Sequence, residues 1–265
     1  MKIIFSVDPL DRQTISHIKM ELENTKEERL TIDELIIPSN IEGHDVMRLS
    51  HLLKFDFYDL SQKGITIKRV IISEGIRELP IKCFYGIDNI ETVILPTTCY
   101  DIPPSCFELS SIRSVIASDN VCVIGEEAFK SSSINHFDWP ASCEKIPSKC
   151  FLGSSLVDIS FRGDITTIYK GAFAYSTIEK FVWPEKCKVI PDSCFAMCRN
   201  LSDIKFPSYI EKLYLSAFRS CFALSKIDFS TSWYITILDN IKFIGLNSIA
   251  KKITSPYYGF SLPLC

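Results

Sequence analysis

The chain has 265 residues, of which 46% are hydrophobic and 23% are charged, and its formal net charge is -3. This weak negative charge gives no basic footprint, so nucleic acid is excluded as an expected partner. No run approaches the roughly 18 apolar residues of a membrane-spanning helix, and the N-terminus lacks the apolar stretch of about 7–15 residues that marks a secretory signal.

Residues 1–29 carry no repeat pattern and are predicted to be an N-terminal arm or a helical cap. In the segment Thr14–Leu30, three apolar residues (Ile15, Ile18 and Leu22) lie at helical spacing among charged residues. This spacing favours an amphipathic helix. Such a helix would cover the open apolar end of a repeat array, which terminal units have to hide from water.

Residues 30–60 are predicted to be a degenerate first repeat. The run Leu35-Ile36-Ile37-Pro38 has the apolar-then-proline pattern of the later units, and Val46–Leu53 echoes their second half. Terminal repeats of a solenoid are expected to depart from the consensus in this way.

Residues 61–229 contain repeats of 22–23 residues, each ending in a phenylalanine. Every unit also has an apolar triplet of the form L-x-x-L-x-L, such as Ile178, Phe181 and Trp183, which is typical of leucine-rich repeats. The period therefore predicts a repeat solenoid with parallel β-strands on the concave face and short turns or helical pieces on the convex face. The phenylalanines are expected to form one continuous internal stack. They are Phe84, Phe107, Phe129, Phe151, Phe173, Phe195 and Phe218.

Ten of the eleven cysteines follow the same repeat. Those directly before the recurrent phenylalanine share their column with alanines, and a column that accepts either residue calls for a small buried side chain. All ten repeat cysteines, including Cys122, are predicted to be reduced and packed, whereas Cys265 is expected to be an exposed thiol whose redox state is open. The spacings do not match those of zinc sites, so no metal or cofactor is expected.

The spacing breaks after Phe218. Residues 230–265 are therefore predicted to be an insertion, 230–240, followed by a C-terminal cap, 241–265.

Strings such as VCVIGEEAFKSSSI and FVWPEKCKVIPDSCFAMCRNL resemble the BspA-like leucine-rich repeats, a surface-antigen family expanded in some parasitic protists. The resemblance covers about residues 30–250. It implies a non-catalytic scaffold that binds host or matrix protein in adhesion at the cell surface. The lack of a signal peptide and the reduced-looking cysteines favour the alternative, an intracellular protein–protein interaction adaptor, so both the cell surface and the cytoplasm stay open.

No catalytic constellation emerges, because the four histidines are scattered and no glycine-rich nucleotide motif is present. Neither an enzyme nor a small-molecule substrate is therefore predicted. The partner is expected to be a protein bound by outward-facing residues of the concave strands, the first three of which form an apolar stripe. The alternative interpretation is that the N-terminal segment covers this stripe, or that β-propensity alone selects isoleucine. The candidate residues are Ile71, Ile94, Ile116, His136, Asp138, Asp158, Lys180, Val182 and Lys205.

Overall fold

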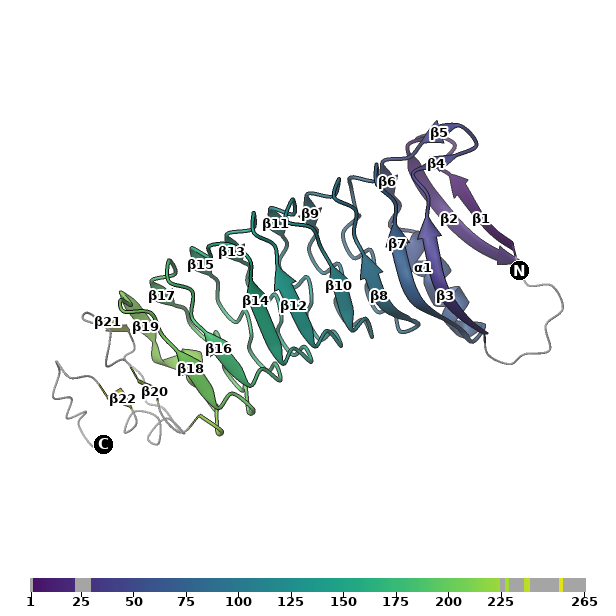
Figure 1. The fold of residues 1–265 in the computed structure, drawn as a ribbon. Helices are drawn as coiled ribbons and strands as arrows, with labels where there is room; N and C mark the ends of the chain where they lie inside the picture. Colours follow the sequence, from purple (N-terminus) through teal and green to yellow (C-terminus); the bar gives the residue numbers. More distant parts are fainter. Residues whose placement is uncertain (1, 22–29, 225–226, 229–235, 239–252, 255–265) are drawn as a thin grey trace.

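The computed structural model describes residues 2–21, 30–224, 227–228, 236–238 and 253–254. The described chain forms an elongated solenoid in which each successive repeat adds one turn along a single axis (Figure 1). This confirms the predicted repeat solenoid of mostly parallel strands. The predicted insertion and cap at 230–265 fall largely outside the described residues, and the proposed segment boundaries remain predictions.

One row of strands runs along the face shown in Figure 1, and we call it the strand ribbon. Its members pair in parallel within three separate sheets, ordered β10-β8-β7-β3, β12-β14 and β16-β18. The bounds are β3 (Leu30–Ile37), β7 (Ile65–Ile72), β8 (Ile90–Ile94), β10 (Ser114–Ile116), β12 (His136–Trp139), β14 (Asp158–Phe161), β16 (Lys180–Val182) and β18 (Asp203–Lys205).

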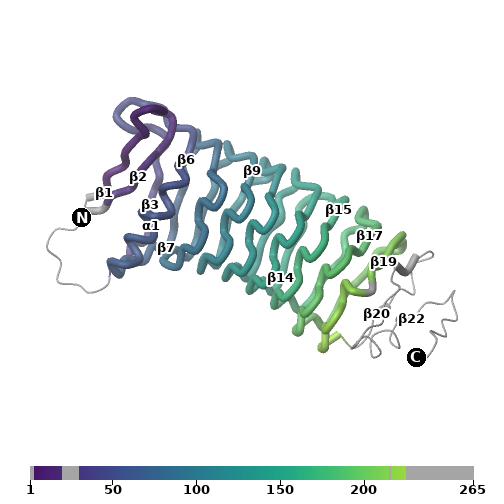
Figure 2. Tube along the Cα trace, turned by 180° about the vertical axis from the view of Figure 1, so that it is seen from behind, coloured from purple at the N-terminus to yellow at the C-terminus, as the bar shows by residue number. Residues whose placement is uncertain are grey.

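A second row of shorter strands follows one edge of the solenoid and is also visible from behind (Figure 2). Each strand comes after the apolar triplet, and those up to residue 214 carry the next inward residue of their unit. The bounds are β9 (Asp101–Ile102), β11 (Val123–Ile124), β13 (Lys145–Ile146), β15 (Thr167–Ile168), β17 (Val189–Ile190), β19 (Lys212–Tyr214) and β21 (Thr236–Leu238). A 3-10 turn, η1 (Leu215–Phe218), follows β19, and β20 (Ile227–Asp228) pairs with β22 (Ile253–Thr254).

The predicted helix at Thr14–Leu30 is wrong over its first half. Residues Thr14–Glu21 form strand β2, which pairs antiparallel with β1 (Lys2–Val7), and residues 22–29 lie outside the described part of the chain. The register places Ser6 opposite His17 but Val7 opposite Ile15, so Ser16 is one extra residue in β2. Such a bulge returns Ile15 and Ile18 to one buried side, which reproduces the helix-like spacing of three.

The first repeat differs from the others by containing a helix, α1 (Leu53–Gln62), and a small hairpin, β4 (Asn40–Ile41) with β5 (His44–Asp45). Glu42 and Gly43 both have positive φ, as the tight hairpin turn requires. The helix buries Leu53, Phe57 and Leu60 against the end of the core. It closes the solenoid at this end together with the sheet β1-β2-β6, where β6 is Arg48–Leu49.

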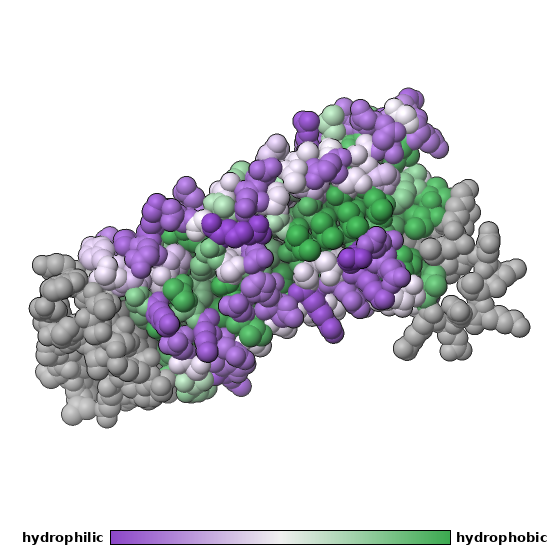
Figure 3. All heavy atoms as spheres, in the orientation of Figure 1, coloured by the Kyte–Doolittle hydropathy of each residue, from purple (hydrophilic) through white to green (hydrophobic). Residues whose placement is uncertain are grey.

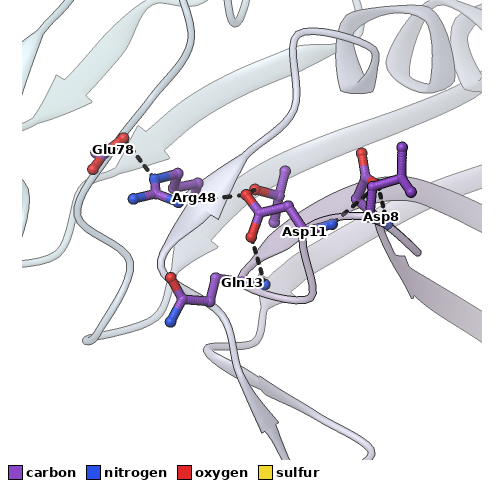
Figure 4. Close-up of polar contacts among 7 residues, drawn as sticks. Asp8, Asp11, Gln13, Arg48 and Glu78 are labelled. Atoms are coloured by element: carbon purple, nitrogen blue, oxygen red, sulfur yellow. Dashed lines mark hydrogen bonds and ion pairs between the residues drawn. The ribbon is translucent and has the colours of Figure 1, made fainter.

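Arg48 ties this terminal sheet to the first full turn (Figure 4). Its Nε lies 2.8 Å from a carboxylate oxygen of Glu78, and its guanidinium lies 3.4 Å from Asp11 in the loop between β1 and β2. The Asp11 carboxylate also accepts a hydrogen bond from the backbone N–H of Gln13. The hydrogen bonds to Asp11 from Thr14 and Gln13 hold its pKa below the ordinary value.

The predicted phenylalanine stack is confirmed. Neighbouring rings from Phe84 to Phe218 lie 5.1–5.8 Å apart between centroids and within 3–9° of parallel. Phe57 of α1 extends the column by one ring, 5.7 Å from Phe84. In six of the turns, the phenylalanine N–H also donates to a carbonyl of the next turn at 2.7–2.9 Å, so hydrogen bonds run in one direction beside the rings.

The ten described cysteines are all free thiols, and nine of them are buried. Burial raises the pKa of Cys99 and Cys198 to about 11. Cys122 is exposed, contrary to the expectation that it packs inside, because Val121 occupies the inward position of that turn. Cys265 lies outside the described residues.

Candidate protein-binding surface

The outward positions of the strand ribbon form straight rows across neighbouring turns. The pairing of β3, β7, β8 and β10 places four isoleucines side by side, and we call them the isoleucine row: Ile36, Ile71, Ile94 and Ile116. Three of them were predicted. Sequence reasoning missed Ile36, although Leu35-Ile36-Ile37-Pro38 repeats the strand-then-proline pattern of later units.

The isoleucine row is open to solvent. Its two outer members are 54% (Ile36) and 52% (Ile116) exposed, whereas Ile71 and Ile94 are half-buried because each lies between two neighbours. Figure 3 shows the corresponding hydrophobic patch over the ribbon, with hydrophilic residues directly beside it. Strand β2 pairs with β1 on one side and with β6 on the other, and the exposure of Ile36 and Ile116 shows that this described part of the N-terminal segment leaves the row uncovered.

Charged residues flank the isoleucine row on the same strands. Lys68 of β7 lies 2.7 Å from Asp33 of β3, and Arg69 forms an ion pair with Glu34. The hydrogen bond between Lys68 and Asp33 lowers the pKa of the carboxyl and raises that of the amine. Together with Glu91 and Thr92, these residues line a shallow surface depression.

The middle of the ribbon is polar. His136 lies 3.1 Å from Asp138 and, through its other ring nitrogen, 3.4 Å from Asp158 on the adjacent strand. The hydroxyl of Ser160 donates to Asp138, and this bond together with that from His136 lowers the pKa of Asp138. Because the Ser160 hydroxyl is held by a carboxylate and not by the imidazole, the cluster lacks the serine–histidine contact of a nucleophilic site. It is a network of polar contacts on the surface.

The three candidates nearest the C-terminal end belong to β16 and β18. The register places Lys180 opposite Asp203 and Val182 opposite Lys205, and all four side chains are exposed. Val182 is 64% exposed and is the most exposed apolar side chain of this part of the ribbon. The nine predicted residues therefore all lie on one face, divided into an apolar part and a polar part.

A cleft of about 390 Å³ opens between β14 and β16, which do not pair with each other. Its floor includes Ile159 and Phe161, which are half-buried, and Phe181 and Trp183 of the next turn. Its rim is formed by polar side chains, with Asp158 and Lys180 at one end and Asp164, Glu185 and Lys186 at the other.

The turn after β14 explains the cleft. Arg162 stands where Pro140 and Pro184 stand in the neighbouring units, and it reaches back to Asp119 at 3.1 Å and to the Ala117 carbonyl at 3.1 Å. At Gly163, a Cβ would clash with the carbonyl oxygen of Ala141. The turn is therefore held against the preceding units, on the side opposite β16. Sequence reasoning missed this cleft, although the substitution of arginine for proline was its visible signal.

Within the described residues, no group of three or more metal-ligating side chains converges on one point. In the same part of the chain, no helix has the length and apolar character that crossing a membrane requires.

Comparison with known proteins places these features in a family. A model of the BspA type leucine-rich repeat region matches residues 61–157 and 123–250, with six copies of the repeat. No curated protein sequence matches the chain.

Among solved structures, a leucine-rich repeat protein from Bacteroides ovatus is similar, with a TM-score of 0.60 and 17% identity, over 92% of this chain and 77% of that one. A leucine-rich repeat protein of T. pallidum has a TM-score of 0.49 and 20% identity, over 84% of this chain and 87% of that one. At these identities, the likeness concerns the fold alone.

Proposed function

The chain belongs to the BspA-type leucine-rich repeat family, and from this premise we propose that it is a non-catalytic scaffold that binds another protein through its strand ribbon. The observation that carries the proposal is the isoleucine row. Four adjacent isoleucines on the open face of a rigid sheet form a contiguous apolar patch, and contiguous exposed apolar patches commonly mark interaction sites.

The frame around the row suits recognition. The buried phenylalanine stack fixes the spacing of the strands, so outward residues are presented in set positions before a partner arrives. Little conformational entropy is then lost on binding. The cleft between β14 and β16 offers a second apolar contact on the same face, with Phe161 accessible at its floor.

We propose adhesion to a host or matrix protein at a cell surface as the biological role, on the basis of the family. The second candidate is an intracellular protein–protein adaptor. One observation favours it: the ten described cysteines are free and nine of them are buried, as is usual where thiols stay reduced.

The proposal is tested by capture of partners with the wild type and with the triple variant Ile71→Ser, Ile94→Ser, Ile116→Ser. A matched control is Val123→Ser, which removes an exposed apolar residue from β11, outside the ribbon. We expect the triple variant to lose a partner that the wild type and the control retain, with its circular dichroism spectrum unchanged. Equal capture by all three proteins would refute a role for the isoleucine row.

Parallel capture from an extracellular-matrix preparation and from cytosol distinguishes the two candidate roles. A partner that depends on the isoleucine row and is found only in the matrix preparation supports adhesion, whereas one found only in cytosol supports the adaptor.

A further inference from the structure

The charges beside the isoleucine row alternate in sign from strand to strand. Strand β3 carries Asp33 and Glu34, β7 carries Lys68 and Arg69, and β8 contributes Glu91. Arg113, directly before β10, completes the series. All six side chains are exposed and lie on the same strip of the surface as the row.

Within one chain, only four of these six charged side chains form ion pairs with one another. The acids of β3 pair with the bases of β7, whereas Glu91 and Arg113 have no ion pair with any residue in the described part of the chain. Glu91 acts on Lys68 through its charge without forming an ion pair, so one acid and one base lack a direct ion-pair partner there and can contact a second molecule, at positions fixed by the register of the sheet.

The pattern is complementary to itself. Consider a second copy placed face to face with the first and related to it by a twofold axis. The axis runs parallel to the strands and lies between β7 and β8. This rotation keeps the direction of each strand. Under this rotation β7 faces β8 of the other copy, and β3 faces β10. The isoleucine rows then meet each other, and every charged strand meets one of opposite sign, as an isologous interface requires. In particular, Arg113 faces Asp33 and Glu34, and Glu91 faces Lys68 and Arg69.

We propose that the isoleucine row and its flanking charges bind the same patch on a second copy of the chain. The inference rests on the proposed function, because it names the partner of that surface. Four strands about 4.8 Å apart form a patch only about 20 Å wide, so the interface lies at the small end of specific contacts. The dimer is therefore reversible, and its formation depends on concentration.

The first experiment is sedimentation equilibrium of the wild type from low to high micromolar concentration. The chain has a mass of 30.2 kDa, and we expect a reversible shift toward twice that mass. The variant Ile71→Ser, Ile94→Ser is expected to weaken dimerisation at least tenfold. The control Lys145→Glu, a charge reversal at the exposed position of β13, is expected to leave it unchanged.

A charge exchange tests the arrangement itself. Arg113→Glu places like charges opposite each other in a homodimer, and so does Asp33→Lys with Glu34→Lys. We expect each variant alone to be monomeric, and an equimolar mixture of the two to form a heterodimer in which both contacts regain opposite signs. Thermal melts of each variant establish that it is folded, and recovery on mixing is an outcome that loss of stability does not produce.

The inference is overturned if the wild type sediments as a monomer throughout, or if the two charge variants dimerise alone as well as they do together. A monomeric chain that still captures a different protein through the isoleucine row refutes the inference and leaves the proposed function standing. A dimer that captures no other protein supports the inference and refutes the adhesion and adaptor roles, both of which need a different protein.

Discussion

Replacing Phe173 with alanine removes an interior ring of the stack and should destabilise the protein strongly. Phe173 is fully buried, with parallel ring neighbours at 5.6 Å (Phe151) and 5.3 Å (Phe195) and a tilted neighbour, Phe181, at 5.1 Å. Phenylalanine-to-alanine changes in cores cost about 3–5 kcal/mol. We expect the upper end of this range, because rings on both sides lose a contact and backbone hydrogen bonds fix the spacing of the flanking turns, so the cavity cannot collapse.

Urea unfolding followed by far-UV circular dichroism measures this loss of unfolding free energy. Phe222→Ala is the matched control, since that ring is 72% exposed and its removal should change the free energy by less than about 0.5 kcal/mol. If Phe173→Ala unfolds at the wild-type midpoint, or if the two variants lose equal stability, the stack does not hold the turns together.

Three further predictions concern the thiols and the cleft. In native protein treated with a thiol reagent at neutral pH, Cys122 should react fastest of the described cysteines, because the others are buried; protection of Cys122 in peptide mapping would contradict this. Stability in the presence of reductant should fall as the pH rises from 9 towards 11, because thiols such as Cys99 and Cys198, raised to about 11 from an ordinary 9.0, stay protonated in the folded state and ionise more easily once unfolded. Urea midpoints that fall no more steeply over this range than those of the corresponding Cys→Ala variants would contradict the burial of these thiols. Arg162→Pro, which restores the residue of neighbouring units, should bring β14 and β16 together, and a crystal structure of the variant with the cleft still open would refute our account of Arg162.

Much of the fold could be predicted because one column of the repeat is nearly invariant within the chain. A phenylalanine every 22–23 residues has one economical explanation, a turn of constant length with the ring inside, and the structure has this arrangement. The outward rows followed from the same period, since strand geometry fixes which residues alternate with the buried ones.

The errors arose where one residue changes the local geometry. In β2, the extra residue Ser16 gives strand residues a helix-like spacing, and periodicity alone cannot separate the two cases. Cys122 lies seven residues before its phenylalanine, whereas the buried Cys143 lies eight before its own. In an extended segment this single step reverses the side chain's direction. The cleft depends on where the Arg162 side chain reaches across two units, which no repeat pattern specifies.

The one-directional column of hydrogen bonds beside the phenylalanine rings has a consequence for how such a chain changes length. Each turn donates forward and accepts from behind in the same way, so a whole unit can be duplicated or excised and the turns on either side meet with the same geometry. The length of the solenoid can therefore change without altering the existing surface. Each added unit lengthens the frame and brings its own outward residues, which can vary separately.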